Sequence, residues 1–224
     1  MTNPGGEHYI RPSPVHSNIP KKVMNKKIFT QIVQALPPNA KILDAGCGSG
    51  NNSRLLYSIR KDLRIWGVDI DSAHKKAVPE YVQFVQASVT DLKRFKSGTF
   101  DAIACFHLVE HLPHPEEAIQ EFQRVLKKDG VLFAEAPHWI CAVTPIGTNF
   151  WDDPTHLRPH SKASFAELFK RFTVEYLKVE PPIMFFLADL YQVSRFSFRQ
   201  FLGMLGLYKI AVFLIAKNTN PSKN

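Results

Sequence analysis

The feature that most constrains the fold is the stretch ILDAGCGSG at residues 42–50. An apolar run ends in an acid, and glycines follow at positions 46, 48 and 50. Glycine weakens the interior of a strand or helix, but it adopts left-handed conformations and lets a ligand approach the backbone. A strand that ends in such a turn and continues into a helix is typical of nucleotide-type sites. We therefore predict a ligand site at this turn.

The rest of the chain alternates between strand-like and helix-like segments. Apolar residues at helical spacing predict helices, and short buried-type runs between them predict strands. Such alternation favours an α/β fold, here a Rossmann-like sheet of seven mostly parallel strands with helices on both faces. The last two strands lack an ordinary helical crossover, so we expect an antiparallel pair at one edge. The predicted strands are 41–46, 63–71, 81–88, 100–106, 131–137, 173–180 and 208–217, and the predicted helices are 21–36, 51–61, 115–130 and 161–172.

A length of 224 residues suits one domain with a substantial core. Residues 1–20 are polar and contain four prolines, so they are expected to form a flexible arm before a single domain at 21–224. A hydrophobic helical insert is expected near 181–206. It could lie on a membrane surface or cover a lipophilic acceptor, or it could be a core-packing or dimer helix.

Charge and cysteine content narrow the classes of partner and compartment. The net charge of +8 is compatible with anionic partners, but a solvated basic face is the preferred explanation, because the sequence has no recognised nucleic-acid motif. The three cysteines form no CxxC pair, so neither a disulfide framework nor a structural zinc site is indicated. The polar, proline-rich start is unlike a secretory signal, and no apolar run reaches membrane-spanning length. These observations predict a cytoplasmic protein.

The glycine turn does not fit the dinucleotide fingerprint GxGxxG, because Asn51 occupies the position of the last glycine. Its pattern, acid-x-Gly-x-Gly-x-Gly beginning at Asp44, resembles motif I of class I S-adenosylmethionine-dependent methyltransferases of the type 11/23 kind. The segments WGVDID, FVQASVTDL and FDAIACFHLVEHLPHPEEAIQEFQRVLKKDGVLFAEAP resemble the family's following motifs. The resemblance covers roughly residues 40–137.

The resemblance implies S-adenosylmethionine as the cofactor. Asp69 stands where the family has an acid that bonds both ribose hydroxyls. Ser88 stands where many relatives have an acid that holds the adenine, so this contact departs from the pattern, and Val89 would lie against the adenine ring. The full set of expected cofactor-binding residues is Asp44, Gly46, Cys47, Gly48, Gly50, Asp69, Ile70, Ser88, Val89 and Phe106.

The sequence HLVEHLPH after the fourth strand carries candidate catalytic residues. On a helical turn, His107, Glu110 and His111 would share one face, where they could supply a general base or bind a divalent metal. Ubiquinone-type and small-RNA methyltransferases carry a metal-binding Glu-x-x-Glu-His pattern here, with a histidine from a later loop. In this chain His107 replaces the first glutamate, and His156 matches the later histidine. His107 is the first choice for a general base.

The predicted function is methyl transfer from S-adenosylmethionine to a hydroxyl on a small or lipophilic molecule. The aromatic segment 138–160 follows the fifth strand and is expected to line the acceptor pocket. Two alternatives stay open: an RNA 2′-O-methyltransferase, which the basic arm and the histidines support, and a regulatory protein that binds the cofactor without turnover. A peripheral membrane contact is a further possibility, and the oligomeric state is not predicted.

Overall fold

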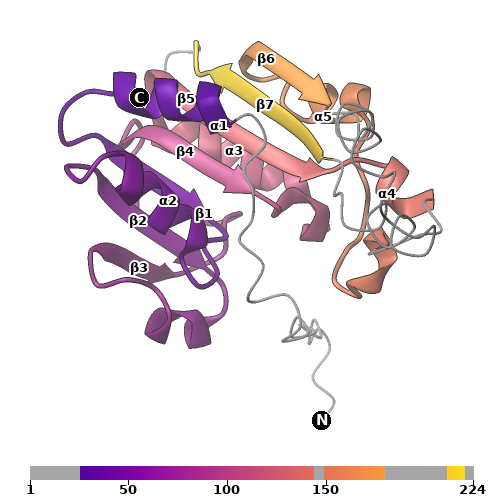
Figure 1. Cartoon of the computed structure of the whole chain (residues 1–224), viewed down its shortest axis with the longest axis horizontal. Helices are drawn as coiled ribbons and strands as arrows, with labels where there is room; N and C mark the ends of the chain where they lie inside the picture. The colour runs from indigo at the N-terminus through magenta and orange to yellow at the C-terminus, as the bar shows by residue number, and fades with distance from the viewer. Residues whose placement is uncertain (1–25, 144–148, 180–210, 220–224) are drawn as a thin grey trace, which may run out of the picture.

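The computed structural model of the chain describes residues 26–143, 149–179 and 211–219 (Figure 1). Their centre is a seven-stranded sheet in the order β3-β2-β1-β4-β5-β7-β6. All neighbouring strands pair in parallel except β7, which is antiparallel to both β5 and β6. The predicted fold class and the antiparallel pair at one edge are therefore confirmed. The strands are β1 Lys41–Ala45, β2 Arg64–Asp69, β3 Val82–Gln86, β4 Phe100–Phe106, β5 Leu126–Pro137, β6 Thr173–Val179 and β7 Ala211–Lys217.

Helices and short 3-10 turns connect these strands. The helix α3 begins with proline at its first position and has two glutamates in its first turn, as the sequence predicts for a helix start. The helices are α1 Lys26–Ala35, α2 Asn51–Ile59, α3 Pro115–Val125, α4 Ile140–Val143 and α5 Lys162–Leu168. The 3-10 turns are η2 Ser72–Lys76, η3 Val109–His111 and η4 Phe150–Asp152. None of the described helices has the length and apolar content needed to cross a membrane.

The sheet has a separate apolar core on each face. One core joins Phe29 of α1 and Leu56 of α2 to the strands, and the other joins Phe122 of α3 and Phe165 of α5 to them. Figure 1 shows α1 and α2 in front of the sheet. The sheet is consequently buried on both faces, as its almost continuous apolar strands require.

The end of α3 differs from the prediction. The helix was expected to run to Gly130 but ends at Val125, and residues 126–130 already belong to β5. The side-chain amide of the buried Asn218 donates to the carbonyl oxygens of Gln123 and Leu126, 3.0 Å away in each case. This residue, distant in sequence, bonds carbonyls at the C-terminal end of the helix.

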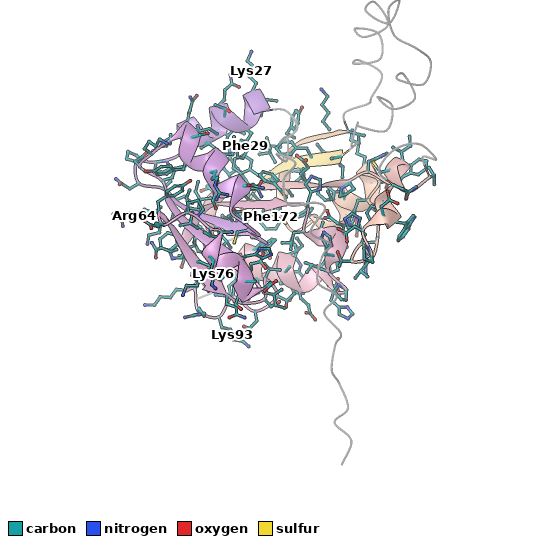
Figure 2. The ribbon with its side chains drawn as sticks, turned by 60° about the horizontal axis from the view of Figure 1, so that its bottom comes forward. Lys27, Phe29, Arg64, Lys76, Lys93 and Phe172 are labelled. Carbon is teal, nitrogen blue, oxygen red and sulfur yellow. The ribbon has the colours of Figure 1, made fainter. Side chains whose placement is uncertain are left out.

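Basic side chains are distributed around the described part of the molecule. Figure 2 shows Lys27, Arg64 and Lys93 extending outward at separate edges, while Phe29 lies under α1. These three basic side chains do not form a single patch. The predicted arm at 1–20 and the predicted insert at 181–206 lie outside the described residues.

The order of strands places a topological switch at the centre of the sheet. From β1, the chain moves outward through β2 and β3 in one direction and through β4 and β5 in the other. In open α/β sheets, ligands bind beyond the carboxyl ends of the strands at such a point. The turns after β1, β2 and β4 meet there.

Candidate active site

The glycine turn after β1 has the backbone that its sequence predicts. Gly46, Gly48 and Gly50 have φ values of 66°, 50° and 84°, all in the left-handed region. A Cβ atom on Gly48 would meet no atom within 4 Å, so this side of the turn is open. A Cβ atom on Gly46 would lie 2.7 Å from Leu108 Cδ1, and one on Gly50 would lie 2.8 Å from Pro79 Cδ. Two glycines therefore admit neighbouring side chains, and Gly48 leaves room for a ligand.

Asp69, at the end of β2, is tied directly to this turn. Its Oδ2 accepts a hydrogen bond from the Gly48 amide at 2.8 Å, and its Oδ1 accepts one from the Asp71 amide at 3.0 Å. A carboxylate offers about four acceptor positions, so these two bonds orient the group without exhausting it. The following side chain, Ile70, is 54% exposed and offers an apolar surface beside the carboxylate.

Asp44 and Cys47 support the turn from inside. The fully buried Asp44 carboxylate accepts a 2.6 Å hydrogen bond from the Ser53 hydroxyl, which links the end of β1 to α2. The Cys47 amide donates to the Val68 carbonyl at 3.0 Å. Burial, followed by the charges of Asp44 and Asp69, raises the pKa of the Cys47 thiol. The thiol is thus a packing group and not a nucleophile at neutral pH.

The remaining predicted cofactor residues fall into two environments. After β3, the Ser88 hydroxyl lies 2.7 Å from the Thr90 hydroxyl, and Val89 is buried. Phe106, at the end of β4, is only 1% exposed and its ring packs between those of Phe29 and Phe213. The Phe106 side chain is therefore a core residue, so a cofactor contact at this position, which stays a prediction, would have to come from its backbone.

His107 follows β4 and lies between two buried carboxylates. Its Nε2 is 3.1 Å from Glu135 Oε1, and its Nδ1 is 3.4 Å from Glu110 Oε1. Burial lowers the pKa of His107, but its hydrogen bonds to the Glu110 and Glu135 carboxylates outweigh burial, and the pKa is raised. Both ring nitrogens already face carboxylate oxygens, so His107 would have to give up one of these contacts to act as a general base, and that role stays a prediction.

The side chains of His107, Glu110 and His111 meet, as the sequence predicts, but the three residues do not lie on one helical turn. His107 has a left-handed φ of 52° and precedes η3, which spans only Val109–His111. The glutamate lies between the two histidines, since His111 Nε2 is 3.9 Å from the same Glu110 oxygen that His107 contacts. Both imidazoles therefore contact one carboxylate oxygen.

Glu110 is fully buried, and the position of its carboxylate is unusual. Its Oε2 has no hydrogen-bond partner among the described residues. Burial raises the pKa of Glu110, but His107 and then His111 outweigh it, so the pKa is lowered to about 2. The Glu110 carbonyl accepts the Leu157 amide at 2.8 Å, which holds the 153–157 segment against η3.

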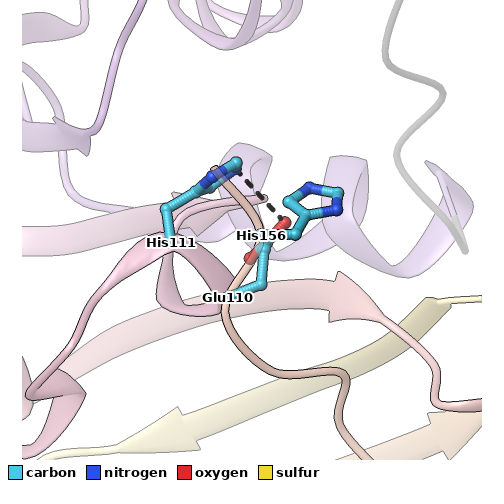
Figure 3. A group of neighbouring side chains, drawn as sticks. All are labelled: Glu110, His111 and His156. Atoms are coloured by element: carbon cyan, nitrogen blue, oxygen red, sulfur yellow. Dashed lines mark ion pairs between the residues drawn. The ribbon is translucent and has the colours of Figure 1, made fainter. Parts of the chain in front are cut away.

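This contact brings His156 to the site, as the sequence predicts. Glu110, His111 and His156 each present a ligand atom within 4.8 Å of the others. Figure 3 shows the two imidazoles and the Glu110 carboxylate converging from the two segments. The two histidine rings lie 4.7 Å apart, centroid to centroid. Three of the four predicted metal ligands thus come together, and His107 contacts Glu110 outside this group.

Glu135 and Thr155 contribute to the site but were not predicted. The signal for Glu135 is its place in the apolar run VLFAEAP, because a charge buried there is costly unless it is paired. Thr155 bonds to His111 Nδ1 at 2.8 Å, and nothing in the local sequence indicates this pairing across 44 residues.

The predicted acceptor loop is partly described. Phe150 is buried, and its ring stacks on His156 at 4.3 Å. Trp151 packs edge-on against Phe150 but stays 55% exposed, and Trp139 is 45% exposed. The two exposed indoles offer apolar surface on the loops that carry His156 and follow β5.

Comparison with known proteins agrees with this geometry. Residues 43–134 match the family model described as methyltransferase domain. A SAM-dependent methyltransferase from Archaeoglobus fulgidus superposes with a TM-score of 0.58 at 18% identity, covering 86% of this chain and 94% of that one. SAM-dependent methyltransferases from Methanosarcina mazei give a TM-score of 0.60 at 20% identity, with 84% and 96% covered. Residues 43–134 thus match a methyltransferase domain, and the solved structures share the fold of this chain, as the sequence predicts.

Among curated proteins, the chain is similar to the ubiquinone biosynthesis O-methyltransferase of Xanthomonas campestris pv. campestris. The two are 33% identical over 101 residues, which are 43% of this chain and 42% of the relative. The chain therefore matches less than half the length of this curated relative.

Proposed function

We propose that this protein binds S-adenosylmethionine at the glycine turn and transfers its methyl group to a hydroxyl on a small or lipophilic molecule. The observation that carries the proposal is the open left-handed turn at Gly48, with Asp69 bonded to its amide. The domain match and the name of the Xanthomonas relative support the same reaction class.

The residues present fit the cofactor. The Asp69 carboxylate has acceptor capacity for a vicinal diol and is fixed by two amides. Ile70 supplies an exposed apolar side chain for a flat ring. Ser88 and Val89 bound the next turn, where the adenine is expected. When bound, the sulfonium cofactor supplies an activated methyl group, so the protein has to align the acceptor and exclude water.

The acceptor is expected on the side formed by the loops after β4 and β5. The partly exposed indoles of Trp139 and Trp151 give that side aromatic surface, which suits an apolar or aromatic acceptor. His107 is then a positioning residue that holds Glu110 in place from the side of Glu135. A hydroxyl as the atom methylated follows the name of the Xanthomonas relative.

Neither alternative function is favoured. The basic side chains labelled in Figure 2 lie at separate edges, which gives an RNA substrate little support. A non-catalytic binding protein has no specific observation in its favour. Cytoplasmic location and a peripheral membrane contact stay predictions.

The proposal is tested by methyl transfer from methyl-labelled S-adenosylmethionine to fractionated cell extract, separated into aqueous and lipid pools. We expect label in a small organic product that is lost in the Asp69→Ala variant. Label in RNA would favour the 2′-O-methyltransferase reading. Cofactor binding without label in any pool would favour the regulatory protein.

A further inference from the structure

We propose that Arg54 is a positioning residue for the cofactor site. Its guanidinium ties the glycine turn to the segment that follows Asp69, and so holds the two walls of the site at a fixed spacing. Arg54 does this without touching the cofactor. The inference rests on the proposed function, because it assigns a task within the site that would bind S-adenosylmethionine.

The Arg54 side chain bonds to both segments. Its Nη1 donates to the Ser49 carbonyl oxygen in the glycine turn at 2.8 Å, and its Nη2 donates to the Ala77 carbonyl oxygen at 2.7 Å. Asn51 Oδ1 accepts a longer bond of 3.3 Å from Nη1. A guanidinium is planar and presents its N–H groups in a rigid fork, so it can bridge two fixed acceptors.

The segment after Asp69 needs such a tie, because apolar packing does little to hold it. None of residues 70–80 is buried, and Val78 is only partly buried against the core. Among the hydrogen bonds of the described residues, the one from Arg54 alone joins 72–77 to a distant part of the chain. Segments with few buried contacts open locally at little expense of free energy. Arg54 therefore restrains a wall of the site that apolar burial leaves loose.

The two walls are also joined nearer to the sheet. Asp69 Oδ2 accepts the Gly48 amide at 2.8 Å, and the Cys47 amide donates to the Val68 carbonyl oxygen at 3.0 Å. The Arg54 bonds join the same two segments farther along both of them. A site whose walls are fixed at two places is preorganised, which reduces the ordering that a ligand has to impose when it binds.

A role in stability explains Arg54 poorly. The helix α2 has no acidic residue in its first turn, and Gly50 supplies no side-chain cap. A cation near this end of a helix is disfavoured by the helix dipole. Arg54 is itself exposed, and substitutions of exposed side chains usually change stability little. The spacing that Arg54 sets between the two walls explains its bonds better.

The same helix supplies a matched control. Arg60, at the other end of α2, also donates to two carbonyl oxygens, those of Leu36 and Pro37 just after α1. It thus joins two segments by the same kind of bond, but outside the cofactor site.

The test compares Arg54→Ala with Arg60→Ala by isothermal titration calorimetry with S-adenosylhomocysteine. We expect Arg54→Ala to weaken binding about tenfold. The melting temperature of the free variant should stay within about 2 °C of wild type. Arg54→Lys should recover only part of the affinity, because one ammonium group lacks the fork that spans both carbonyls. Arg60→Ala should lower the melting temperature and leave the affinity unchanged. Unchanged affinity in Arg54→Ala would overturn the inference.

A second compound separates positioning from direct contact. 5′-Methylthioadenosine keeps the adenine and the ribose but lacks the amino-acid part, so it has no carboxylate to pair with a guanidinium. Positioning predicts the same fold-loss of affinity for both compounds in Arg54→Ala. A loss confined to S-adenosylhomocysteine would show that Arg54 binds the carboxylate, and would contradict the positioning role.

Hydrogen exchange of the free protein keeps this inference distinct from the proposed function. The amides of Ala77 and Val78 donate to the His74 carbonyl oxygen, and both should exchange faster in Arg54→Ala than in wild type. Arg60→Ala should leave their exchange unchanged. If the wild type does not bind S-adenosylhomocysteine, the proposed function fails, while faster exchange would still support the tie between the two segments. Unchanged exchange in Arg54→Ala would overturn the tie whether or not the wild type binds.

Discussion

At the scale of single residues, the glycines of one turn have different tasks. Gly46 and Gly50 allow Leu108 and Pro79 to pack closely, whereas Gly48 faces open space. The sequence shows three glycines at regular spacing and so cannot distinguish them, because the distinction depends on side chains that arrive from other loops.

A pair of alanine substitutions tests this division. Gly46→Ala combines a left-handed φ with a 2.7 Å contact to Leu108, so it should lower the free energy of unfolding by about 1–3 kcal/mol in urea titrations. Gly48→Ala introduces the strain alone and should cost less stability, yet weaken cofactor binding more. Equal losses of stability in the two variants would contradict this account.

At the scale of elements, the turn after β3 is held by α3. The Arg124 guanidinium pairs with Glu121 through two 2.7 Å bonds and donates to the Leu92 and Phe95 carbonyls. Glu121 also accepts the Leu92 amide at 2.7 Å. This ion pair therefore fixes the segment that carries Ser88 and Val89.

Glu121→Gln should destabilise the protein by about 1–2 kcal/mol at pH 7, as expected for a partly exposed charged hydrogen-bond pair. The hydrogen bond from Arg124 lowers the pKa of Glu121 below its usual value. The ionised Glu121 then contributes its full stabilisation above the unfolded pKa of about 4.3. This stabilisation is lost as the pH falls from there through the lowered pKa of the folded state. In urea titrations, the difference in free energy of unfolding between wild type and variant should be smaller at pH 3.5 than at pH 7. A difference independent of pH would argue against the ion pair.

The elements also show where sequence reasoning stops. The alternation of strands and helices and the turn after β1 can be predicted, because neighbouring residues in the sequence determine them. The early end of α3 depends on Asn218, and the placement of His156 depends on the Leu157–Glu110 backbone bond. Both contacts join residues far apart in sequence, so a local pattern contains no sign of them. His107 and His111 were expected on one helical turn, but they do not lie on one, because His107 adopts a left-handed φ.

At the scale of the whole molecule, two cores share one sheet. Phe29 lies in the core under α1, and Phe122 lies in the core under α3. The strands between them, such as β4 and β5, contribute side chains to both. The two faces should therefore unfold together.

Phe29→Ala and Phe122→Ala should each lower the free energy of unfolding by about 3–5 kcal/mol, because each leaves a cavity in a fully buried site. In calorimetry, each variant should show one transition at a lower temperature. A variant in which half of the signal melts separately would show that the faces are independent.

The central claim is that the open turn at Gly48 and Asp69 together bind S-adenosylmethionine. Isothermal titration calorimetry of the purified protein with S-adenosylhomocysteine, and separately with NAD, tests it most directly. The account predicts one site for the sulfur compound, none for NAD, and a loss of about 1.5–3 kcal/mol of binding free energy in Asp69→Ala. Glu175→Gln, on the distant edge strand β6, should bind normally. Binding of NAD, or unchanged affinity in Asp69→Ala, would contradict the account.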